Sequence, residues 1–173
     1  AADYDKTSEQ AQLFFKKVQN KMLWAVTGKT AAELIAERSD SNKPNMGLTA
    51  FKGSIVRKGD VGTAKNYLQQ PEIDELNRVV TMYLDYAEDQ AKKRRTITME
   101  QWVEKLDAFL EFNERDLLTH AGKIEAEVAK KLAVERYEEF DASRKKAEAL
   151  AADEEDIQEL EQIEKRLTKK TNV

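Results

Sequence analysis

One stretch, from Thr27 to Leu68, interrupts a sequence that otherwise follows the pattern of charged, amphipathic α-helices. It holds most of the glycines, one of the two prolines and the polar run from Ser39 to Asn45. Short polar side chains of this kind hydrogen-bond to their own backbone and favour turns over helix. Apolar residues on both sides of the stretch recur at helical spacing. We therefore expect an all-α fold, a helical bundle of about five to seven helices with one long irregular loop.

Capping signals predict where several helices begin. Thr7 with Gln10, and Thr98 with Gln101, have the spacing of a capping box, and Thr30 is suited to cap a helix between them. An aspartate, Asp60, is suited to begin another. Together with the apolar periodicity, these signals predict helices over about 8–27, 31–38, 60–69, 71–95 and 98–122, and a short extended pair near 48–51 and 54–56.

The composition changes after residue 122, where apolar residues become sparse among Glu, Lys, Arg and Ala. We accordingly expect two parts: a helical core domain over 1–122, containing the loop 39–59, and a long charged C-terminal helix or helix pair over 123–173. The apolar stripe of the second part covers barely two heptads, which is short for a coiled coil. Packing back onto the bundle and pairing with another chain both remain open.

The charge balance and the absence of cysteine narrow the function classes. Lys plus Arg number 29 and Asp plus Glu 33, so the formal charge is −4 and the chain lacks the overall basic character of non-specific DNA binders. The chain has no Cys, which excludes disulfides and thiolate metal sites. No apolar run approaches the roughly 18 residues that span a bilayer. We expect a cytoplasmic protein with no membrane partner.

The interrupting stretch combines cationic side chains with carboxylates, and we expect it to carry the binding site. Lysines beside free amides at a helix start near Asp60 would suit a phosphate group. The alternative is that these are solvated loop charges. Glu33 and Glu37 lie one helical turn apart, so an enzyme using a divalent metal is a second hypothesis. The candidate ligand- or phosphate-binding residues are Glu33, Glu37, Arg38, Asp40, Lys43, Asn45, Thr49, Lys52 and Lys65.

Other acidic residues could form a metal site only if helices bring them together. The only histidine, His120, follows Asp116 by four residues, so a helix there would place both on one face. Carboxylates near residues 85–89 and 111–116 would face each other between neighbouring helices, although salt-bridged surface is the simpler interpretation. No Walker A, GxGxxG, nucleophile-elbow or zinc-ligand pattern is present. We predict no metal and no cofactor, and leave catalysis undecided.

Several long segments of the sequence are similar to those of one protein family. The chain resembles the RhuM family of virulence-associated proteins, over residues 4 to about 140. The words that carry the resemblance are AQLFFKKVQNK (11–21), TAAELI (30–35), ERSDSNKPNMGLT (37–49), AKNYL (64–68), MYLDYAEDQA (82–91), KLDAFL (105–110) and AGKI (121–124).

The resemblance implies the C-terminal portion of a longer bacterial protein, with an upstream DNA-binding segment of the winged-helix or phage-antirepressor type. It implies no biochemical activity, and the Fic signature found in some similar proteins is missing. Related sequences often have histidine at the position of Lys29. Lysine cannot act as a neutral metal ligand there, so a shared histidine-dependent reaction is disfavoured, whereas phosphate binding would survive.

These observations favour a helical effector or interaction domain that binds a ligand, nucleic acid or a partner protein. One alternative is a metal-dependent enzyme acting on nucleic acid or nucleotides. Another is a dimerisation module, in which the helix over 153–170 forms a homodimer and the loop is secondary.

Overall fold

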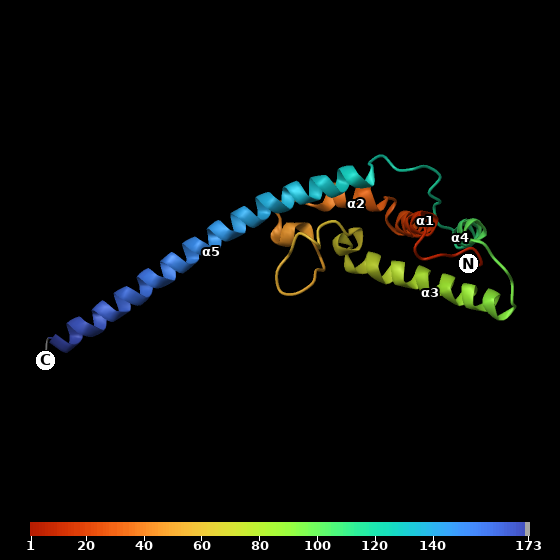
Figure 1. Ribbon diagram of the computed structural model, residues 1–173. Coiled ribbons are helices and arrows are strands. Elements are labelled where there is room, and N and C mark those ends of the chain that lie inside the picture. The colour runs from red at the N-terminus through yellow and green to blue at the C-terminus, as the bar shows by residue number, and fades with distance from the viewer. Residues whose placement is uncertain (172–173) are drawn as a thin grey trace.

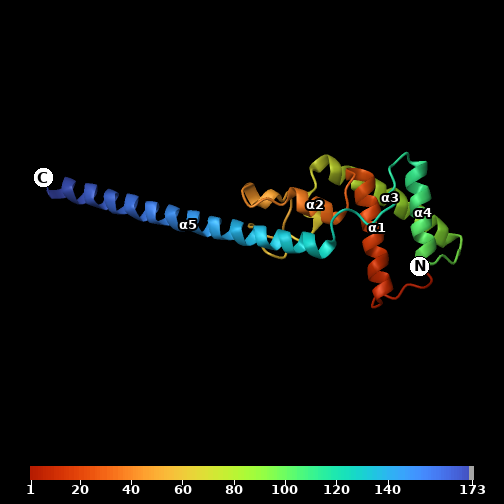
Figure 2. The same ribbon diagram turned by 90° about the horizontal axis from the view of Figure 1, so that it is seen from above.

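The structure, a computed structural model that describes residues 1–171, confirms the all-α fold (Figure 1). A body, residues 1–144, contains the bundle, and an arm, the part of α5 from Lys145 to Thr171, projects away from it (Figures 1 and 2). The N-terminus lies beside α4, at the opposite end of the molecule from the tip of the arm. The elements are α1 (Glu9–Thr27), α2 (Ala31–Arg38), the 3₁₀ segments η1 (Pro44–Gly47) and η2 (Ala64–Tyr67), α3 (Gln70–Lys92), α4 (Met99–Phe112) and α5 (Ala126–Thr171).

The first helix is capped one residue later than predicted. Ser8 Oγ accepts a hydrogen bond from the Ala11 amide at 3.1 Å, as an N-cap does. Thr7 instead directs its hydroxyl to the carboxylate of Asp5, at 2.7 Å. The other two predicted caps are confirmed as complete capping boxes, Thr30 with Glu33 and Thr98 with Gln101.

The bundle forms where α1 packs against α3 and α4. Between α3 and α4, Tyr83 lies edge-on to Trp102 and donates its hydroxyl to the Trp102 carbonyl at 2.7 Å. The only buried lysine among the described residues, Lys21 of α1, reaches Asp107 of α4 at 2.8 Å and the Leu118 carbonyl at 3.1 Å. A buried ammonium group requires such partners, so this contact fixes α1 against α4.

The predicted extended pair and the predicted helix from Asp60 are both wrong. The described part of the loop contains no strand, and beyond η1 its only helical piece before α3 is the short η2. Asp60 is buried, and its carboxylate accepts hydrogen bonds from the amides of Arg57 at 2.9 Å and Lys52 at 3.2 Å. The aspartate therefore closes the loop on itself instead of beginning a helix.

The loop is also part of the hydrophobic core. Met46, Val56, Val61 and Tyr67 are almost completely buried, together with the core side chains of α1, α2, α3 and α4. Tyr67 donates its hydroxyl to the Val61 carbonyl at 2.7 Å, and burial raises the pKa of this phenol. An irregular stretch can thus be well packed when its apolar side chains point inward.

Helix α4 ends at Phe112, ten residues before the predicted end near Gly122. The side-chain amide of Asn113 donates to the Phe109 carbonyl at 2.7 Å, and Glu114 takes a positive φ of 59°, which ends the helix. The residues that follow run back across the body to the start of α2 and lead into α5 (Figure 2).

The C-terminal part is a single helix, and only its first portion packs on the body. Ala129 and Ala133 are fully buried, and α5 lies along α2. Arg144 donates to the Val56 carbonyl at 3.2 Å, which joins α5 to the loop. From Lys145 to Leu167 every residue is exposed. The first portion of α5 therefore packs on the body of its own chain. The predicted division of the chain into two parts after residue 122 stays a prediction.

Candidate functional site

The carboxylate of Glu33 is fully used within the body. Oε2 accepts from the Thr30 amide at 2.9 Å, and Oε1 accepts from the Lys123 amide at 2.7 Å. Partial burial would raise the pKa of this carboxyl, but the two amide hydrogen bonds outweigh it and the pKa lies below its ordinary value. Glu33 thus caps α2 and holds the segment before α5.

Arg38, at the end of α2, likewise has a structural role. Its two terminal nitrogens donate to the two carboxylate oxygens of Glu72, at 2.6 and 2.8 Å, and one of them also reaches the Tyr67 carbonyl at 2.9 Å. This bidentate pair is the strong form of an arginine–carboxylate contact. It joins α2 to the start of α3 and to η2.

Three more candidates shape the loop backbone. Asp40 accepts from the Asn42 amide at 2.9 Å, which is a local turn contact. Asn45 adopts a positive φ of 53°, which asparagine tolerates better than most residues. Thr49 donates its hydroxyl to the Leu68 carbonyl at 2.5 Å and so connects the middle of the loop to the end of η2.

The remaining four candidates are exposed. Glu37 pairs with Lys29. Lys43, Lys52 and Lys65 are exposed and make no side-chain ion pair or hydrogen bond that the described residues show. The nine candidates do not converge on one cavity, so binding of phosphate or nucleic acid by this stretch stays a prediction.

No carboxylate or histidine cluster supports a metal-dependent reaction. Among the described residues, no group of three or more His, Asp or Glu side chains is placed to hold a metal ion. Asp116 and His120 lie in the irregular segment after α4, so the prediction that they share a helix face is wrong. On α3, Glu88 pairs with Lys92 and Asp89 pairs with Lys93, as expected of a salt-bridged surface.

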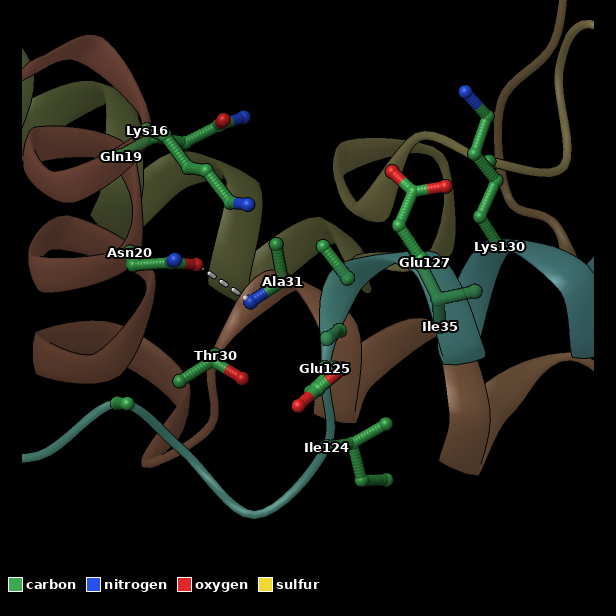
Figure 3. Close-up of a pocket in the computed structure, with 14 residues that line it drawn as sticks. Lys16, Gln19, Asn20, Thr30, Ala31, Ile35, Ile124, Glu125, Glu127 and Lys130 are labelled. Atoms are coloured by element: carbon green, nitrogen blue, oxygen red, sulfur yellow. Dashed lines mark hydrogen bonds between the residues drawn. The ribbon is translucent and has the colours of Figure 1, made fainter. Parts of the chain in front are cut away.

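A hollow of the body lies where the starts of α2 and α5 approach α1 (Figure 3). It has a volume of about 560 Å³. Asn20 of α1 accepts from the Ala31 amide at 2.9 Å across its wall, the contact drawn in Figure 3. Lys16 and Lys130 line it, but so do Glu125 and Glu127. Because the two signs of charge balance, the lining does not select an anion.

Sequence analysis did not identify this hollow. Its two lysines, Lys16 and Lys130, are more than a hundred positions apart in the chain, and nothing in their local sequence indicates that they meet. Only the return of the chain along the segment after α4 brings the start of α5 to α1 and α2 (Figure 2).

The arm is the most unusual surface of the molecule. It carries large apolar side chains that are about half or more exposed, on a helix whose other residues are charged, polar or small. A soluble chain seldom exposes several large apolar residues on one face unless that face binds something. The side chains and their exposed fractions are Leu150 (56%), Ile157 (57%), Leu160 (66%), Ile163 (45%) and Leu167 (61%), which together we call the arm stripe.

Comparison with known proteins assigns the family. The model of the Virulence protein RhuM family matches residues 1–148, so the chain belongs to this family. Searches of curated proteins and of solved structures gave no significant match. The matched region ends at residue 148, so the whole arm stripe lies beyond it. Within the described part of the chain, no helix has both the length and the apolarity needed to cross a membrane.

Proposed function

We propose that this member of the RhuM family is a self-association module, in which two copies of the chain join through the arm stripe. The single observation that carries the proposal is the exposure of all five apolar side chains of the stripe. Removing such side chains from water is the main driving force of helix pairing. The proposal corresponds to the dimerisation hypothesis drawn from the sequence.

The arm suits helix pairing in length and shape. Residues 150 to 167 cover about 26 Å of helix axis, at a rise of ~1.5 Å per residue. The stripe is short for a coiled coil, and Asp153 and Asp156 interrupt it between Leu150 and Ile157. We expect an association that depends on protein concentration, not an obligate dimer. The body has its own core and needs no partner to bury it.

The competing interpretations have less support. In α2 and the loop, Glu33, Arg38, Asp40 and Thr49 are engaged in contacts that hold the body together. Substituting these residues would disturb the fold, so a loss of binding in such variants could not be assigned to a lost binding site. The arm stripe is the largest set of large apolar side chains that any single described helix leaves exposed.

The test is the molecular mass in solution at a low and a high protein concentration, measured by light scattering after gel filtration. We expect the unchanged chain to approach the mass of a dimer at the high concentration. The double variant Ile157→Glu with Leu160→Glu places two charges in the stripe and should remain a monomer, because a buried unpaired carboxylate is strongly unfavourable.

A matched control adds the same charge on another face. Gln158→Glu with Gln162→Glu lies on the side of the helix away from the stripe, at about 100° per residue. This variant should associate like the unchanged chain. If the unchanged chain is monomeric at both concentrations, or if both variants lose association equally, the proposal is wrong.

A further inference from the structure

We infer that the two copies pair in an antiparallel orientation, with residues 158 and 159 of each arm at the crossing point. This inference rests on the proposed self-association through the arm stripe and specifies the geometry of the partner. The occupant is a second copy of this chain, whose own arm stripe supplies the complementary apolar surface.

The first argument concerns the faces of α5. The side that contacts the body includes Ala129, Ala133 and Phe140, whereas the arm stripe includes Leu160 and Leu167. At about 100° per residue, the stripe lies roughly 160° around the helix from the side that packs on the body. The stripe is therefore not a continuation of the intramolecular packing surface. A second helix can lie along it without meeting the body of the first copy.

The second argument concerns charge along the arm. Residues 151–158 carry four acids, Asp153 to Asp156, and no base, which is a charge of −4. Residues 159–166 carry three glutamates together with Lys165 and Arg166, which is a charge of −1. Parallel pairing would place the −4 segment against itself. Antiparallel pairing places it against the −1 segment and reduces the repulsion between the copies.

The third argument concerns which side chains meet. The ends of the stripe are Leu150 and Leu167, so its midpoint lies between residues 158 and 159. Antiparallel pairing about this point brings Leu150 near Leu167 of the second copy and Ile157 near Leu160 of the second copy. Antiparallel pairing still sets Asp153 opposite Glu164, but it also places Lys165 and Arg166 within a turn of the acidic run of the second copy. Parallel pairing would set Asp153 and Asp156 against their own counterparts and would keep both bases away from the acidic run, which is less favourable.

This geometry makes a closed two-fold dimer, since the same surface is used on both copies. The two bodies would lie at opposite ends of the paired arms. The Arg144 positions of the two copies would be separated along the axis by about 45 Å, at a rise of ~1.5 Å per residue. In a parallel dimer the two bodies would lie side by side at one end.

The experiment is a distance measurement between spin labels by double electron–electron resonance on the full chain. The chain has no Cys, so a single introduced cysteine gives one label per copy. The two label positions are Glu148→Cys and Gln158→Cys, both exposed and outside the stripe. In the antiparallel dimer the labelled positions are offset along the axis by about 30 Å for Glu148 and about 2 Å for Gln158.

We expect the Glu148→Cys pair to give a clearly longer distance than the Gln158→Cys pair, because its axial offset is about 30 Å instead of about 2 Å. Dilution with unlabelled chain should remove both signals, because they arise between copies. Equal distances at the two positions would indicate parallel pairing and overturn the inference while leaving self-association in place. The lack of any distance at either position, together with the mass of a monomer for the labelled chain at the high protein concentration, would overturn both.

Discussion

The two portions of α5 have similar charged compositions and opposite surroundings. From Ala126 to Arg144 the helix packs on α2 and the loop through small residues, Ala129 and Ala133, which are fully buried. Val134, Tyr137 and Phe140 of the same portion are partly buried against the core. Beyond Arg144 the apolar residues are sparser, and the large ones are exposed. The portion of α5 that joins the core is therefore the one that combines small side chains at the helix contact with a higher apolar content.

Polar contacts strengthen this difference. Arg136, in the packed portion, donates to the Ala36 carbonyl at 2.7 Å and to both the carbonyl and the hydroxyl of Ser39, at 2.6 and 2.7 Å. These acceptors lie at the end of α2, where carbonyl groups have no partner within the helix. In the arm, ion pairs such as Lys165 with Glu161 run along the helix itself.

The largest effect should come from a backbone change confined to the body. Gly47 has a φ of +82°, and a Cβ added there would lie 2.3 Å from the Arg38 carbonyl oxygen. We expect Gly47→Ala to lower the free energy of unfolding by about 4 kcal/mol, because strain and a backbone clash act together. Urea unfolding followed by the fluorescence of Trp24 and Trp102 measures it, since both tryptophans lie in the body.

Gly53 provides the matched control for that prediction. Its φ is +75°, but a Cβ there meets no atom within 4 Å. Gly53→Ala should cost only about 1 kcal/mol, from backbone strain alone. Equal losses for the two variants would contradict the close approach of η1 to the end of α2.

A smaller effect should separate the two portions of α5. Arg136→Ala leaves the Ser39 and Ala36 carbonyls without their donor, and we expect a loss of about 2 kcal/mol in the free energy of unfolding. Arg166→Ala makes the same chemical change in the arm and should alter it by less than about 0.5 kcal/mol. The same urea experiment, at a concentration where the chain is monomeric, compares them. Similar losses for both would mean that the packing of the first portion contributes little.

The smallest effect should appear on acidification. The hydrogen bonds from Arg38 hold the pKa of the Glu72 carboxyl below its ordinary value of 4.5. Its contribution is therefore complete above that value and is lost as the pH falls through the lowered pKa. Between about pH 5 and pH 3 the unchanged chain should lose roughly 1 kcal/mol more stability than Glu72→Gln. If urea unfolding gives the same dependence of stability on pH for both proteins, the Arg38–Glu72 pair is not a source of acid sensitivity.

Local signals in the sequence predicted the helices well. A capping box such as Thr30 with Glu33 depends only on residues one turn apart, and it forms as expected. The end of α4 was missed although Asn113, which caps it, is a local signal. Asp60 was misassigned because the amides it accepts from, those of Lys52 and Arg57, belong to the preceding loop. An aspartate that closes a loop and one that begins a helix look alike in sequence.

The candidate site was harder to predict for a physical reason. The charges of the interrupting stretch were interpreted as ligand-binding groups because their partners are distant in sequence. Glu72 lies 34 positions after Arg38, and Lys123 lies 90 positions after Glu33. The apolar residues of the arm were identified from the sequence, but their exposure was not, since the same pattern fits packing in cis and pairing in trans.

Helix α5 is unbroken from the body into the arm. The direction in which the arm stripe faces is therefore fixed relative to the body. Inserting one residue between Arg144 and Leu150 would turn the stripe by about 100° relative to the body, whereas inserting seven would return it to within about 20° of its starting direction. In a dimer, the direction in which one body faces relative to the other would thus be set by the number of residues in this short connecting segment.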